Sequence, residues 1–180
     1  QTLAAYGGFN FIEFGGNNHM QIRNVTIPAN VLEGLQRHLM LYFTGFSRNA
    51  SEIAKHQIDN IPNKQFELTT MYDMAFQALD ILNKGNLEKF GKLMYESWKI
   101  KRELSAKIST SHIDALYDAA MRAGAIGGKL LGAGGGGFVL FFVPPAKQKA
   151  VKEKLKKLLL VPFDFENLGS QIIVYQPNGK

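Results

Sequence analysis

The chain has 180 residues, a formal net charge of +6 and no cysteine. This length corresponds to one domain of ordinary size or to two small ones. Apolar residues make up 46% of the chain, which is enough to bury a core and excludes a disordered protein. The lack of cysteine excludes disulfides, thiolate metal sites and cysteine nucleophiles, and it is compatible with the cytoplasm, where we expect the protein.

The N-terminal quarter of the chain is predicted to be mainly β-structure. Residues 1–6 are typical of a helix end, and a chain that begins in this way is expected to be part of a longer protein. Three strands are predicted next, because aromatic and apolar residues alternate or form short runs bounded by turn residues. They span residues 9–14, 20–27 and 38–43, with a helical turn at 29–36 before the third strand.

Four helices are predicted in the middle of the chain, at residues 47–60, 67–83, 86–104 and 111–123. The apolar face of the second contains Leu68, Met71, Tyr72, Ala75, Leu79 and Leu82. The face of the third contains Trp98, which we expect in the core. The fourth opens with Ser111 and Asp114 at the spacing of a capping box.

The last part of the chain is predicted to alternate between strand and helix. Residues 138–143 are apolar throughout, which indicates a strand buried on both faces. A helix is predicted at 146–160 and a final strand at 171–175. The whole order predicts an α+β fold in which helices pack on an antiparallel or mixed sheet.

Most of the positive charge lies in one segment. Residues 147–157 contain six lysines and one glutamate, and so carry +5 of the net charge. Val151, Leu155, Leu158 and Leu159 form a one-sided apolar stripe, which favours a surface helix with a solvated lysine face. Binding of an anionic partner is the alternative. Nucleic acid is the less favoured partner, because no arginine or aromatic residue is interleaved for base stacking.

Glycine is concentrated in another segment. Eight of the 18 glycines lie between Gly124 and Gly137, and four of them are consecutive. Each glycine costs about 0.5–1 kcal/mol relative to alanine, so this cluster requires a reason. One reason is a phosphate cradle of backbone N–H groups, and the other is a tight connection packed under a helix. The segment is neither a Walker A loop nor a Rossmann fingerprint.

The residues Gly128–Phe138 resemble the third sequence motif of the GHMP kinases, a family that includes galactokinase and the homoserine, mevalonate and phosphomevalonate kinases. The segments Ala4–Phe14 and Leu41–Ser51 resemble bacterial sugar kinases of the D-glycero-D-manno-heptose 7-phosphate kinase type. The resemblance covers the whole chain. It implies a GHMP kinase C-terminal domain with a ferredoxin-like core and extra helices.

The resemblance also implies that part of the enzyme lies outside residues 1–180. The family's Gly-Leu-Gly-Ser-Ser phosphate loop belongs to an N-terminal domain, and Gln1 resembles the Gln of an Asp-Gln pair whose Asp acts on the acceptor. Residues 1–28 are expected to belong to that domain or to cross over from it. We therefore expect a C-terminal domain that is inactive alone and that works with ATP and Mg²⁺, both bound mainly by the N-terminal domain.

The resemblance implies transfer of the γ-phosphoryl group of ATP to a sugar or sugar phosphate, with heptose 7-phosphate favoured. We expect neither nucleic acid nor membrane as a partner. The candidate phosphate-binding and substrate-binding residues are Gly134, Gly135, Gly136, Gly137, Arg48, Lys129, Ser47 and Asn49. Thr44 is a further candidate for a sugar hydroxyl.

Each side-chain candidate has a plainer interpretation. Arg48 follows a strand at a helix start, where it could clamp a phosphate in a bidentate manner or simply pair with a carboxylate. Lys129 adjoins the glycine loop and is equally compatible with a solvated lysine. Ser47 could serve only as a helix cap. The four histidines lack metal-ligand spacing. A non-catalytic module that binds a phosphorylated ligand remains the alternative to a kinase.

Overall fold

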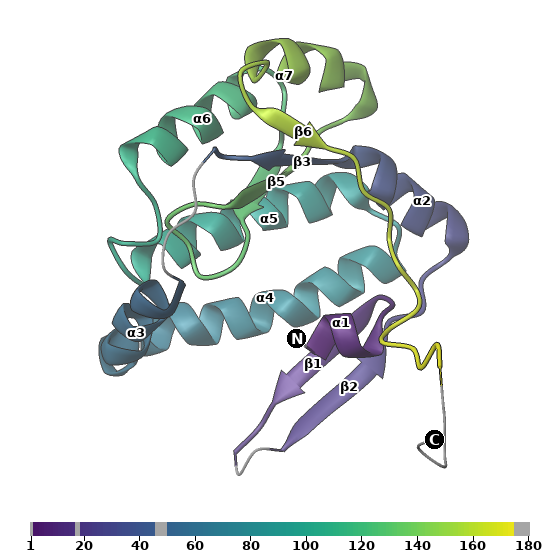
Figure 1. The fold of residues 1–180 in the computed structure, drawn as a ribbon, viewed down its shortest axis with the longest axis vertical. Helices are drawn as coiled ribbons and strands as arrows, with labels where there is room; N and C mark the ends of the chain where they lie inside the picture. The colour runs from purple at the N-terminus through teal and green to yellow at the C-terminus, as the bar shows by residue number, and fades with distance from the viewer. Residues whose placement is uncertain (1, 17–18, 46–49, 175–180) are drawn as a thin grey trace. The chain divides into compact units, whose positions relative to one another are not determined.

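The computed structural model describes residues 2–16, 19–45 and 50–174 (Figure 1). The chain divides into two compact units. The first combines residues 1–27 with residues 164–180, and the second is residues 28–163.

The second unit is built on an antiparallel sheet. Its strands are β3 (Leu39–Phe43), β4 (Gly127–Leu130), β5 (Phe138–Phe142) and β6 (Leu159–Val161), in the order β4-β5-β3-β6. Each neighbouring pair is antiparallel, and Leu41 lies opposite both Leu140 and Val161. The predicted α+β class is confirmed, and the described strands pair only in the antiparallel sense.

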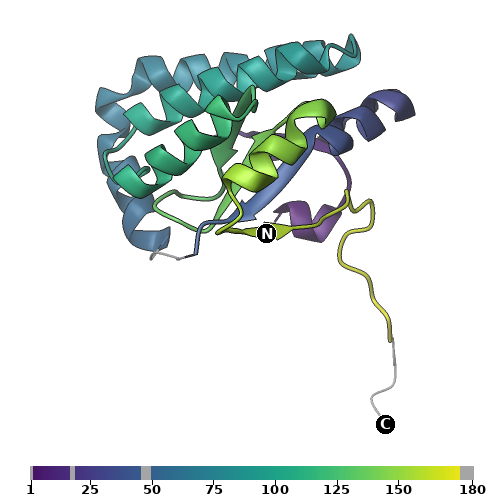
Figure 2. The ribbon, with the colours of Figure 1, turned by 90° about the horizontal axis from the view of Figure 1, so that it is seen from above.

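Helices cover one side of this sheet, as Figure 2 shows for α4, α5 and α6. The helical segments of the unit are α2 (Ala29–His38), α3 (Ala50–Asn60), η1 (Ile61–Asn63), α4 (Gln65–Asn83), α5 (Leu87–Glu103), α6 (Ser111–Arg122), η2 (Pro145–Lys147) and α7 (Gln148–Lys154). The core lies between α5, α6 and the sheet. There the Trp98 ring stacks on the Tyr117 ring with 5.9 Å between the ring centroids, and the centroids of Tyr117 and Phe141 lie 5.5 Å apart. Trp98 is buried, as its helical spacing predicted.

Strand β4 lies directly against the backbone of α5. A Cβ atom on Gly127 would stand 1.9 Å from the carbonyl oxygen of Gly91. On the neighbouring residue, the carbonyl of Gly128 accepts a hydrogen bond from the Tyr117 hydroxyl at 3.0 Å. This strand was not predicted from the sequence, because local reasoning assigns Gly127 and Gly128 to the start of the glycine loop. In the structure, glycine at 127 is what allows a helix to approach a strand so closely.

The first unit contains α1 (Thr2–Tyr6) and a hairpin of β1 (Asn10–Phe14) and β2 (Met20–Asn24). The hairpin register places Ile12 opposite Ile22. The segment after residue 163 packs on the end of α1: the Gly8 N–H donates to the Glu166 carbonyl at 2.8 Å, and the Ser170 N–H to the Ala5 carbonyl at 2.9 Å. Residues 5–8 and residues 166–170 therefore pack together within the first unit.

The lysine-rich helix is shorter than predicted. It ends at Lys154 instead of residue 160, and Leu159 lies in β6 with its side chain exposed. Val151 and Leu155 are buried, so the first half of the predicted stripe is correct. Pairing of residues 159–161 with the edge of β3 overrides the helical periodicity, because the backbone groups of that edge gain partners.

The predicted final strand is wrong for residues 171–174, and residue 175 lies outside the described part of the chain. Within the described residues these four pair with no strand. Ile172, Ile173 and Val174 are strongly exposed. Their β-branched composition predicts a strand, but a strand requires an edge to pair with, and no described strand offers one here.

Several boundaries also differ from the prediction. The helical turn at 29–36 is the longer helix α2, and strand 20–27 ends at Asn24. Tyr72 is exposed and packs edge-on against Phe76. Thr110, rather than Ser111, caps α6 by accepting a hydrogen bond from the Ile113 N–H at 3.3 Å. None of the helices in the described ranges combines the length and apolar character of a bilayer span.

Candidate functional site

The glycine loop, residues 131–137, joins β4 to β5 in a conformation that requires glycine. Gly132, Gly134, Gly135 and Gly137 have φ values of 70°, 119°, 76° and 94°, a region that L side chains rarely adopt. At Gly134 a Cβ atom would also stand 2.8 Å from the Cα of Ile108. At Gly132 and Gly137 the corresponding space is open. The loop is thus packed against the protein in its middle and accessible at both ends.

The carbonyl oxygens of the loop are held by donors from three separate elements. On α5, the Lys101 Nζ donates to the carbonyls of Leu130 at 3.1 Å and Gly132 at 2.7 Å. On α3, the Gln57 side-chain amide donates to the Ala133 carbonyl at 2.6 Å. After β3, the Thr44 N–H and hydroxyl both donate to the Gly137 carbonyl, at 2.8 and 3.0 Å.

The N–H groups of the same loop are used much less. The Gly135 N–H donates to the Ile108 carbonyl at 2.8 Å. Within the part of the chain that the structure describes, the N–H groups of Ala133, Gly136 and Gly137 donate to no other group. A loop whose carbonyls are anchored and whose N–H groups remain available is suited to bind an anion.

Two lysines add positive charge beside the first residues of this loop. Burial and the positive charge of Lys129 lower the pKa of Lys101 to about 8, and burial also lowers the pKa of Lys129. Among the described residues neither lysine lies within ion-pair distance of a carboxylate, whereas six other lysines do. A partly buried pair of cations of this kind is stabilised by a bound anion.

Of the predicted residues, Gly134, Gly135, Gly136 and Gly137 follow one another in the loop, and Lys129 lies on β4, close enough to Lys101 for the two charges to interact. Thr44, by contrast, is buried and holds the loop rather than facing a ligand from the open side. The candidates Arg48, Ser47 and Asn49 lie outside the described residues.

Sequence reasoning missed Lys101 and Gln57. Lys101 stands three residues after buried Trp98 and three before buried Leu104, so its spacing places it on the inward face of α5. A lysine on an apolar stripe was the available signal. Gln57 had no such signal, because only the tertiary fold brings α3 to the loop.

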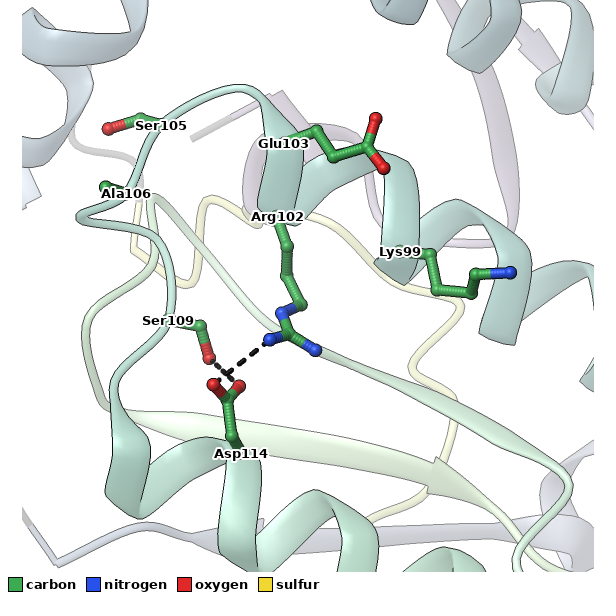
Figure 3. Close-up of a pocket in the computed structure, with 7 residues that line it drawn as sticks. All are labelled: Lys99, Arg102, Glu103, Ser105, Ala106, Ser109 and Asp114. Atoms are coloured by element: carbon green, nitrogen blue, oxygen red, sulfur yellow. Dashed lines mark hydrogen bonds and ion pairs between the residues drawn. The ribbon is translucent and has the colours of Figure 1, made fainter.

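A separate hollow lies between the end of α5 and the start of α6, lined by Lys99, Arg102, Glu103, Ser105, Ala106, Ser109 and Asp114. In Figure 3, Arg102 and Ser109 both point toward Asp114. The Arg102 guanidinium lies 3.0 Å from the Asp114 carboxylate, and the Ser109 hydroxyl donates to it at 2.6 Å. These charges satisfy one another, so we assign the ligand site to the glycine loop instead.

In the ranges that the structure describes, no group of three or more histidine and acidic side chains is placed to hold a metal ion. The groups that the described part of the loop region offers a ligand are backbone N–H groups and the ammonium groups of Lys101 and Lys129. An anion with several oxygens, such as a phosphate group, matches both kinds of donor.

The fold and the loop define an α+β domain with a candidate anion-binding loop between two antiparallel strands. A family model described as "GHMP kinases C terminal" matches residues 75–159, a stretch that includes this loop. The match confirms the resemblance that Gly128–Phe138 carries, and it identifies a GHMP kinase C-terminal domain in this chain.

Characterised relatives agree with this assignment. The chain is 30% identical over 160 residues to the D-glycero-alpha-D-manno-heptose 7-phosphate kinase of Campylobacter jejuni. This match covers 87% of this chain and 47% of that protein. It is 32% identical over 139 residues to the galactokinase of Clostridium tetani, covering 76% of this chain and 33% of that protein. The chain thus spans less than half the length of these relatives.

Solved structures show the same fold. A D-glycero-D-manno-heptose 1-phosphate kinase from Bacteriodes thetaiotaomicron superposes with a TM-score of 0.62 at 25% identity, over 97% of this chain and 48% of that one. The L. major mevalonate kinase superposes with a TM-score of 0.70 at 20% identity, over 88% of this chain and 50% of that one. The second likeness concerns the fold alone.

Proposed function

We propose that this chain forms the C-terminal part of an ATP-dependent kinase that phosphorylates a hydroxyl of a sugar or sugar phosphate. The observation that carries the proposal is the glycine loop, whose carbonyls are anchored by three elements while N–H groups at Ala133, Gly136 and Gly137 stay available. The kinase relatives support the reaction class.

Phosphoryl transfer depends mainly on positioning and on electrostatic stabilisation of the phosphate oxygens. In this proposal the loop N–H groups bind phosphate oxygens, and the Lys129 ammonium adds charge next to them. ATP and Mg²⁺ are held mainly by an N-terminal domain, with which we also group residues 1–28. That domain supplies the general base, so the chain alone is expected not to phosphorylate a sugar.

The acceptor that we propose is a heptose 7-phosphate. The 30% identity to a heptose 7-phosphate kinase supports this choice over an unphosphorylated sugar. Arg48 is the proposed clamp for the acceptor phosphate, and Ser47 and Asn49 are proposed to bond its hydroxyls. Arg48→Ala in the intact kinase is expected to raise the KM for heptose 7-phosphate about tenfold or more, with a smaller change in the KM for ATP. An unchanged acceptor KM would remove Arg48 from the site.

The test measures ADP formation by the whole gene product that encodes this chain, with ATP, Mg²⁺ and a series of acceptors. The series includes heptose 7-phosphate, the same heptose without phosphate, galactose and mevalonate. Gly137→Ala is expected to lower kcat/KM at least a hundredfold, because its methyl group would enter the open space in front of the loop.

Gly85→Ala is the matched control for this variant. Gly85 also has a positive φ, 69°, but it ends α4 and takes no part in the loop. Equal losses in both variants would indicate backbone strain rather than a phosphate site. Activity with none of these acceptors would refute the proposed reaction.

A further inference from the structure

Lys101 occupies an unusual place on α5. Its neighbours Lys99 and Arg102 pair with Glu96 and Asp114, both at 3.0 Å. Lys101 instead directs its ammonium group to two backbone carbonyls at the start of the glycine loop, Leu130 and Gly132. The proposed function includes Lys101 only as one of the three anchors of the loop carbonyls and gives its positive charge no role.

The geometry ties the helix to the loop at one atom. Leu130 ends β4 and Gly132 is the first glycine of the loop, so the single Nζ bridges the point where the strand stops and the loop begins. A Cβ atom on Gly132, whose φ is 70°, would meet nothing within 4 Å, so no group packs at that position. The Lys101 bridge, together with the hydrogen bond from the Leu131 N–H to the Phe138 carbonyl at 2.8 Å, therefore restrains the direction in which the loop leaves the strand.

The cost of placing Lys101 there points to a purpose. Its ammonium group is partly shielded from water and lies close enough to Lys129 for the two charges to repel. A neutral donor would hold the two carbonyls without this penalty, as the Gln57 amide does for Ala133. A charged donor additionally makes the potential at the loop positive, which favours an anion with several negative charges.

We propose that Lys101 is a positioning residue of the glycine loop: it fixes the loop in its anion-binding shape and supplies a partly buried charge that favours a diphosphate group. This inference rests on the proposed function, because it assumes that the loop binds phosphate. It differs from that proposal in naming a residue that acts through the loop without touching the ligand.

The experiment follows the loop amides of the ¹⁵N-labelled 180-residue chain by NMR during titration with inorganic pyrophosphate. Lys101→Met removes the donors and the charge, while Lys101→Gln keeps donors without charge. Lys99→Met is the matched control, because it removes a charge two residues away on the exposed side of the same helix. Far-UV circular dichroism confirms that each variant is folded.

Without ligand, Lys101→Met is expected to shift the amide signals of Gly132 and Ala133, and Lys101→Gln to restore much of their wild-type position. With pyrophosphate, both variants are expected to bind about tenfold or more weakly than wild type, because a partly buried charge near the ligand is lost. Lys99→Met should change the affinity less than twofold.

The outcomes separate the two proposals. Wild-type loop signals together with wild-type affinity in Lys101→Met would overturn the role of Lys101 and leave the phosphate loop intact. A wild-type chain whose loop amides do not respond to pyrophosphate would count against the phosphate loop itself. In that case the ligand-free spectra still decide the positioning role, since unchanged signals in Lys101→Met would refute it.

Discussion

The packing of β4 against α5 allows a stability prediction with a defined size. In Gly127→Ala, the new methyl group would stand 1.9 Å from the Gly91 carbonyl oxygen, 2.9 Å from the Gly91 carbonyl carbon and 3.0 Å from the Tyr95 nitrogen. All three atoms belong to the α5 backbone, so no side-chain rotation relieves the overlap. The helix must instead retreat from the strand by about 1 Å or more.

The retreat of α5 sets the magnitude. Overpacking of a core costs about 1–3 kcal/mol, and a gap of 0.5–1 Å forfeits a quarter to a half of each dispersion contact that it opens. Met94 and Trp98 are buried on the moving helix, so both terms apply. We expect Gly127→Ala to lower the free energy of unfolding by about 3 kcal/mol, which corresponds to a fall in Tm of about 10 °C.

Urea denaturation followed by tryptophan fluorescence measures this loss, because Trp98 is the one tryptophan in the sequence and lies on α5. The control is Gly132→Ala, which introduces the same methyl group at a positive φ but into open space. It is expected to cost about 1 kcal/mol from backbone strain alone. If Gly127→Ala were no less stable than Gly132→Ala, the close contact between β4 and α5 would be refuted as the reason for glycine at 127.

Three further predictions concern buried polar groups and a helix cap. The Tyr42 hydroxyl is buried and has no hydrogen-bond partner among the described residues, so Tyr42→Phe should leave the free energy of unfolding unchanged or raise it by about 1 kcal/mol in urea titrations. The pKa of Lys101 is lowered from 10.5 to about 8, so between these values the unfolded chain binds the extra proton. Stability is therefore expected to rise with pH above about 8, by up to about 1.4 kcal/mol per unit, and Lys101→Met should flatten this rise in urea midpoints taken from pH 7.5 to 9.5. Thr110→Ala removes the cap of α6 and should cost about 1 kcal/mol in the same assay, whereas Ser111→Ala should cost less than half of that.

Hydrophobic periodicity predicted most helices and the apolar strands well, because the residues that an element buries repeat at the spacing of that element. Strand β4, which begins with Gly127 and Gly128, was not predictable in this way. Those glycines serve a contact with α5 that lies more than 30 residues away in sequence, while local reasoning assigns them to a loop. The predicted end of the lysine-rich helix was wrong for a related reason. Residues 159–161 form strand β6 by pairing with β3, a contact that the local sequence does not show.

The candidate site shows the same division between local and tertiary information. The glycine cluster could be recognised from the sequence alone, because consecutive glycines cost conformational entropy on folding and are unexpected without a function. The side chains that hold the loop could not be recognised as its anchors in the same way. Gln57 and Thr44 are ordinary polar residues in the sequence, and only the fold places them at the carbonyls of Ala133 and Gly137. Lys101 could have been predicted from the sequence, because a lysine between two buried helix positions is uncommon.

The contact between the two ends of the chain has a consequence for the order of folding. Gly7 and Gly169 lie so close that a Cβ on Gly7 would stand 2.3 Å from the Gly169 nitrogen, and the residues between the two ends form the separate unit 28–163. During synthesis, residues 28–163 leave the ribosome before Gly169 does. The inner unit can therefore complete its core while α1 and the β1–β2 hairpin still wait for residues 164–170, so these elements are made before the inner unit but reach their final packing after it.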